Sequence, residues 1–131
     1  MPRNYQRKKN NPYLLPHNLY MRVLYIVKDY DRLKDEYHAI LDSGAAAGVV
    51  NANTGGAPLT PTEDKAIRLA LISDELHAIE QALMMIPDEY RQGVKHNVMY
   101  GAWYPGDADE RTYRRWKQCF INQVARRLKF L

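Results

Sequence analysis

Cysteine, long apolar runs and large aromatic side chains other than tyrosine are scarce in this sequence of 131 residues. Cys119 is the single cysteine, so no disulfide can form within the chain, and this fits a reducing compartment. Nowhere do about 18 apolar residues follow one another, so we expect no membrane-spanning helix. The basic first residues also lack the apolar stretch of a signal peptide. These absences predict a cytoplasmic protein without a membrane partner.

The motifs of catalysis and cofactor binding are missing as well. The sequence has no glycine-rich phosphate loop and no nucleophile elbow, and no spacing pairs Cys119 with a histidine. The similar stretches DEYHAI and DELHAI each place an aspartate three residues before a histidine. Their helical register puts both side chains outside the apolar seam, whereas metal ligands in a helical bundle project inward. We therefore expect no enzymatic activity, no cofactor and no metal.

Acidic residues are scarce at both ends of the chain. Residues 1–11 carry four basic and no acidic side chains, residues 105–131 carry seven basic and three acidic ones, and the middle is mildly acidic. Positive charge at both ends indicates that the ends meet a polyanion. We interpret residues 1–13 as a disordered basic arm, which either contacts a phosphate backbone or is a solvated tail without a partner.

Apolar residues recur at intervals of three and four in two segments, which predicts two long helices, at 17–41 and 60–86. The repeating positions are Leu19, Val23, Ile26, Tyr30, Leu33, Tyr37 and Ile40, then Leu69, Ile72, Leu76, Ile79, Leu83 and Ile86. Between them, residues 43–59 hold four glycines and little charge, as in a flexible linker. Residues 14–86 therefore predict an antiparallel helical hairpin, although the coiled-coil-like seams could equally pair with a second copy in a homo-oligomer.

Residues 87–131 form the third predicted region. A short helix at 88–100 ends at Gly101, a Pro-Gly turn follows, and a basic amphipathic helix runs toward the C-terminus. A short helix, a tight turn and a basic helix make a helix-turn-helix-like arrangement. The whole chain is thus predicted to be all-α, with a long antiparallel helical hairpin followed by a compact helix-turn-helix-like part.

The final helix is the candidate DNA-binding element. Tyr113, Trp116 and Phe120 recur at helical spacing and are expected to anchor it in the core. Its other face is basic, and guanidinium groups pair with phosphates and with guanine edges. The three acidic residues just before this helix would repel DNA. The alternative interpretation is that the basic face is exposed to solvent and binds no DNA. The predicted DNA contacts are Arg111, Thr112, Arg114, Arg115, Lys117 and Gln118.

The stretch IPDEYRQGVKHNVMYG, followed by YPGDADERTYRRWKQCFINQVARRL and preceded by a capped helix, resembles the RinA-type phage transcriptional regulators. The resemblance covers residues 15–131 in layout and is most specific over 86–128. The positions that match the recognition helix of that family are Thr112, Tyr113, Arg114, Arg115, Trp116, Phe120, Val124, Ala125 and Leu128. Members of the family carry a further helix before this one, whereas here only residues 101–110 span the gap, so the chain resembles an abbreviated variant.

The resemblance implies a region like the helix-turn-helix of sigma factor region four. It implies a DNA-binding transcriptional regulator of a phage or mobile genetic element, with double-stranded DNA as the partner and RNA polymerase as a further candidate. The alternative is a helical oligomerisation or protein-interaction module of a phage that binds a polymerase or packaging partner without specific DNA binding. The two differ in whether the basic face of the last helix is exposed to a polyanion.

Overall fold

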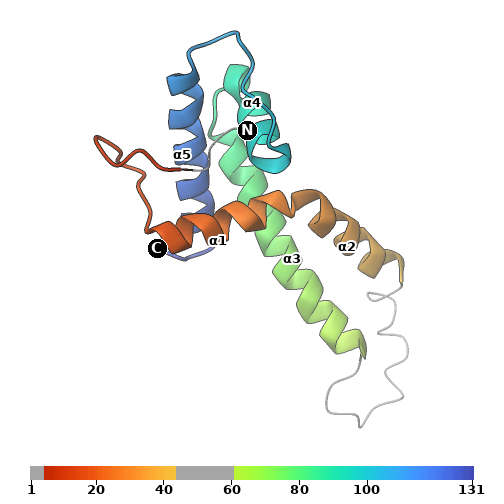
Figure 1. Cartoon of the computed structure of the whole chain (residues 1–131). Helices are drawn as coiled ribbons and strands as arrows, with labels where there is room; N and C mark the ends of the chain where they lie inside the picture. The colour runs from red at the N-terminus through yellow and green to blue at the C-terminus, as the bar shows by residue number, and fades with distance from the viewer. Residues whose placement is uncertain (1–4, 44–60) are drawn as a thin grey trace.

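The computed structural model describes residues 5–43 and 61–131, and within these ranges it contains five α-helices and no strand (Figure 1). The helices are α1 His17–Lys28, α2 Tyr30–Asp42, α3 Pro61–Met84, α4 Asp88–Tyr100 and α5 Glu110–Arg127. The predicted all-α class is confirmed for this part of the chain. In the same ranges, no helix combines the length and the apolar character that crossing a membrane requires.

The first predicted helix is divided at Asp29, where a single continuous helix was expected. The backbone N–H of Asp29 still donates to the carbonyls of Tyr25 and Ile26, but its ψ of 5° turns the axis. The division has a tertiary cause, because α1 packs against α4 and α5 whereas α2 packs against α3. Within the first predicted helix, α2 is therefore the part that packs on α3, and α1 is the part that packs on the C-terminal helices.

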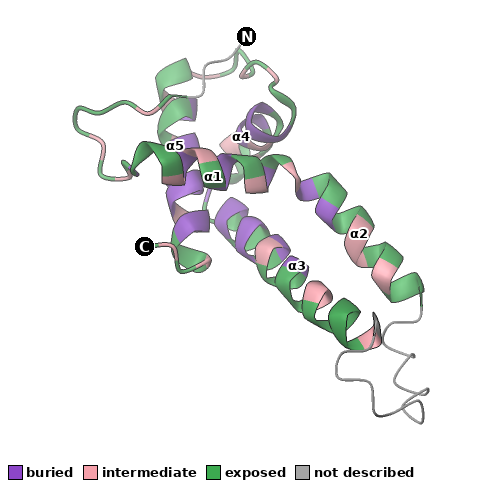
Figure 2. Ribbon diagram, turned by 60° about the horizontal axis from the view of Figure 1, so that its bottom comes forward, coloured by how far each residue is buried: buried purple, intermediate pink, exposed green. Residues whose placement is uncertain are grey.

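Helix α2 and the first half of α3 lie side by side and project away from the other helices (Figures 1 and 2). Arg68 of α3 ties them together, because its Nε donates to Glu36 Oε2 of α2 at 2.6 Å. In this part of α3, Ile67 and Leu71 are more than half exposed. The predicted linker, from residue 44 on, lies outside the described residues.

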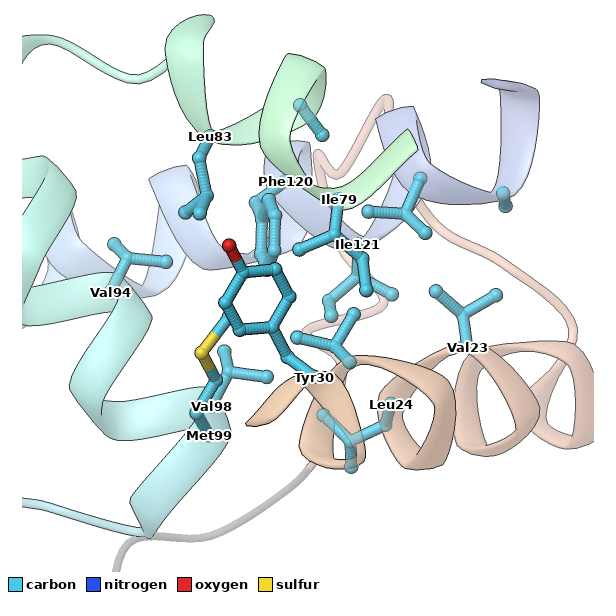
Figure 3. Close-up of a cluster of buried hydrophobic side chains, with 14 of the residues drawn as sticks. Val23, Leu24, Tyr30, Ile79, Leu83, Val94, Val98, Met99, Phe120 and Ile121 are labelled. Atoms are coloured by element: carbon cyan, nitrogen blue, oxygen red, sulfur yellow. The ribbon is translucent and has the colours of Figure 1, made fainter. Parts of the chain in front are cut away.

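The hydrophobic core lies where α1, the second half of α3, α4 and α5 meet (Figure 3). Leu24 and Val27 of α1, Ile79 of α3, Val98 of α4 and Phe120 of α5 are all fully buried there. Burying an aliphatic or aromatic side chain of this kind stabilises the fold by about 1.5–3 kcal/mol. This core fixes α5 in place, so the side chains on its opposite side have a defined position.

Two glycines set the geometry between α4 and α5. Gly101 ends α4 as predicted, with a φ of +68° that glycine adopts without strain. Gly93 lets the two helices approach closely, because a Cβ at that position would lie 2.5 Å from Tyr113 Cε1 and 2.9 Å from Pro105 Cδ. The ring of Tyr113 therefore fills the space that a larger residue in α4 would need.

Candidate nucleic-acid interface

Helix α5 begins at Glu110, and Asp109 caps it. The Asp109 carboxylate accepts a hydrogen bond from the backbone N–H of Arg111 at 2.8 Å, which satisfies one of the unpaired donors of the first turn. Asp107, two residues earlier, accepts a hydrogen bond from the Tyr113 hydroxyl at 2.5 Å. The Asp109 carboxylate interacts favourably with the dipole of α5 at its N-terminus, but it also places a negative charge next to the arginines of the first turns.

The aromatic side of α5 is anchored as predicted. Tyr113 and Phe120 are fully buried, and Trp116 is half-buried and stacks on Tyr90 of α4 with ring centroids 6.5 Å apart. Tyr104, in the connection from α4, stacks on Tyr113 at 5.1 Å. These contacts hold the first half of α5 in one orientation and leave its basic side facing away from the core.

The described part of the N-terminal arm, residues 5–13, lies against α5 together with the residues that join it to α1, whereas a disordered tail was expected. The Gln6 side chain pairs with both backbone groups of Leu15 at 2.8 Å, and its Oε1 also accepts from Gln118 Nε2 at 3.1 Å. Farther along, Asn122 Nδ2 of α5 donates to the carbonyl of Tyr13 at 3.2 Å. Leu15 itself is buried. The arm is therefore held on the polar side of α5 by amide hydrogen bonds.

A groove of about 900 Å³ opens between the arm and the first half of α5. Four of the side chains that line it are arginines, one from the arm and three from α5: Arg7, Arg111, Arg114 and Arg115. Asp109 is the single carboxylate among the described residues that line it, so the excess charge of the lining is positive. The same lining includes Tyr5, Tyr13, Asn10, Asn11, Pro12, Thr112 and Gln118.

The arginines of the groove differ in their partners. Arg111 pairs with Asp109 at 3.0 Å, and Arg114 pairs with Glu110 at 2.9 Å. The Arg111 guanidinium keeps the pKa of the Asp109 carboxyl below its usual value, so that carboxyl stays ionised. Within residues 5–43 and 61–131, Arg7 and Arg115 form no ion pair. Two of the four guanidinium groups therefore face the groove without a neutralising carboxylate.

The structure separates the six predicted DNA contacts into two groups. Arg111, Arg114 and Arg115 are exposed on the groove, and Thr112 is half-buried beside them. Lys117 and Gln118, by contrast, are only 5% and 7% exposed. Those two predictions need correction.

Lys117 lies on the core side of α5. Its ammonium donates to Asn97 Oδ1 of α4 at 2.9 Å, so it cannot reach a phosphate at the surface. Burial, followed by the positive charge of Lys28, lowers the pKa of the Lys117 ammonium to about 8. Gln118 does face the arm side, but its amide is engaged by Gln6. Neither side chain is available as an exposed contact in this arrangement.

Arg7 and Tyr5 are two of the groove residues that were not assigned as contacts from the sequence. Both lie in the arm, which was expected to be disordered. Arg7 is placed beside α5 by the hydrogen bonds that Gln6 forms with Leu15 and Gln118, and Gln118 lies far from Gln6 in the sequence. No local pattern reveals such pairing in a single sequence.

Cys119, the one thiol, is buried beneath the arm and not part of the groove lining. Burial raises the pKa of the thiol, so it is a weak nucleophile, and a hydrogen bond from the Tyr13 hydroxyl opposes this only in part. Within the described ranges, no group of three or more histidine, cysteine and acidic side chains could hold a metal ion.

Comparisons with protein-family models, with curated proteins and with solved structures give no match for this chain.

Proposed function

We propose that this protein is a duplex DNA-binding protein that regulates transcription in a phage or mobile genetic element. One observation carries the proposal: four guanidinium groups from two separate segments line a single open groove. Guanidinium groups bind phosphate through paired hydrogen bonds, and clustered arginines are the usual electrostatic feature of a nucleic-acid-binding surface. The regulatory role rests on the resemblance of α4 and α5 to the RinA-type regulators and extends the proposal beyond binding.

The two ion pairs of the groove arginines, Arg111 with Asp109 and Arg114 with Glu110, do not prevent phosphate binding. The Arg111 side chain is 80% exposed and its Asp109 partner 52%, and the Arg114 pair is similarly open to water. Ion pairs between exposed side chains contribute little to stability, because water and salt screen them. A phosphate can therefore take over these guanidinium groups at small cost.

Affinity for phosphate backbone is expected to depend steeply on salt. If the four arginines each neutralise one phosphate, log K should fall with log salt at a slope of about −3.6, since each phosphate contributes about −0.9. Fluorescence polarisation of a labelled random-sequence duplex, titrated with the full chain over a salt series, measures this slope. Undetectable binding at low salt, or binding that does not change with salt, would contradict the proposal and favour the protein-interaction module.

A further inference from the structure

We infer that the groove between the arm and α5 encloses a single unpaired strand of nucleic acid, with a base stacked on Tyr5. The inference rests on the proposed function and deepens it, because it names the form of DNA that this site takes. Its elements are the groove volume, the exposed ring of Tyr5 and the guanidinium groups on both walls.

The size of the groove favours one strand over two. Sites for small ligands measure about 300–1,000 Å³, so a volume of about 900 Å³ holds a few nucleotides and no more. The groove does not hold both strands of a duplex, whose phosphates would instead reach the exposed guanidinium groups from outside. A duplex would meet only the rim of the groove, whereas a single strand fits between the walls.

The chemistry of the lining also matches a single strand. Grooves that bind unpaired nucleic acid combine positive charge along the backbone path with aromatic faces on which bases stack. Tyr5 is 56% exposed and lines the groove, so its ring is open to a stacking partner. Tyr13 lines the groove as well, but its hydroxyl is engaged with Cys119. Tyr5 is therefore the ring that the structure assigns to base stacking.

The two walls carry like charge, which points to an anion between them. Arg7 on the arm faces the same groove as Arg111, Arg114 and Arg115 on α5. Like charges on opposite walls repel, and a phosphodiester chain between them would turn this repulsion into attraction for both walls. The amide hydrogen bonds of Gln6 keep the arm in place meanwhile, so the groove exists before the strand arrives.

Three labelled DNA probes test the inference with the full chain: a blunt duplex, the same duplex with a short unpaired bubble, and the corresponding single strand. We expect the bubble duplex to bind roughly tenfold more tightly than the blunt duplex, as stacking of one base accounts for a factor of this size. Tyr5→Ala should remove this advantage, so that the bubble duplex and the blunt duplex bind alike, and Tyr5→Trp should keep it.

The matched control is Tyr25→Ala, because Tyr25 is 59% exposed but lies on α1, outside the groove lining. It should leave all three affinities unchanged. Equal binding of bubble and blunt duplex, or an equal loss for both in Tyr5→Ala, overturns the inference while leaving duplex binding intact. Binding of the single strand without any binding of blunt duplex would instead overturn the proposed duplex function and support the strand groove.

Discussion

Replacing Arg114 and Arg115 together with alanine is expected to weaken the binding of duplex DNA by about 100-fold, or about tenfold for each guanidinium lost. Both side chains are exposed and line the groove, so their loss removes phosphate contacts without opening the core. The salt slope should fall in magnitude by about 1.8, because two phosphate contacts are lost. Fluorescence polarisation over the same salt series measures both effects.

The matched control removes the same charge elsewhere. Lys34 on α2 and Lys65 on α3 are exposed and lie outside the groove lining, so the double variant Lys34→Ala/Lys65→Ala should keep its affinity within about twofold. Circular dichroism and thermal unfolding should show both double variants folded. If the two double variants lose affinity equally, the effect is one of net charge and the groove is not the binding surface.

The second large effect concerns Lys117, whose buried ammonium lowers the stability of the folded chain. Its pKa is about 8 in the folded protein, against an ordinary value of 10.5. Between these values the unfolded chain binds more protons than the folded chain, so the free energy of unfolding rises with pH across this window. The difference between the two pKa values corresponds to about 3 kcal/mol in the free energy of unfolding. The folded protein is less stable by this amount below pH 8, and this loss of stability is gone above pH 10.5.

The stability of Lys117→Met relative to the original chain should therefore be greater at pH 7 than at pH 10.5. The difference in unfolding free energy between the two proteins should change by about 3 kcal/mol over this range. Methionine fills the same space without a charge, although it leaves Asn97 Oδ1 without that donor at every pH. Tyr20 and Cys119, whose pKa values are raised by burial, titrate in both proteins and cancel in the comparison.

Urea unfolding of both proteins at several pH values measures the effect. Lys65→Met serves as the control, because it removes an exposed ammonium that stays in water in the folded and unfolded chain alike. A constant difference in unfolding free energy between Lys117→Met and the original chain across this pH range would show that the ammonium is not buried. The side chain would then have to reach solvent along the rim of α4.

Local pattern predicted the parts of the fold that depend on one helix at a time. The burial of Tyr113 and Phe120 and the stop at Gly101 follow from helical spacing and from the freedom of glycine at positive φ. The burial of Lys117 was within reach of the same reasoning. It follows Tyr113 by four residues and precedes Phe120 by three, which places it on the apolar side of the helix.

Tertiary contacts decided the features that the pattern did not predict. The apolar spacing runs through Asp29 without interruption, yet the helix divides there because its two halves pack on different partners. Gln118 lies on the polar side of α5 and is buried only because Gln6 covers it. The groove depends on the contacts between the arm and α5 as well, since these contacts place Arg7 and Tyr5 beside α5.

The most direct test of the central claim is an NMR titration of the full chain with duplex DNA that follows the side-chain Nε–H signals of the arginines. Binding in the groove predicts that the signals of Arg7, Arg111, Arg114 and Arg115 shift together. The signals of Arg32 on α2 and Arg68 on α3, which both pair with Glu36 of α2, should stay in place. Shifts confined to α2 and α3, or shifts in α5 without any in Arg7, would contradict a shared site between the arm and α5.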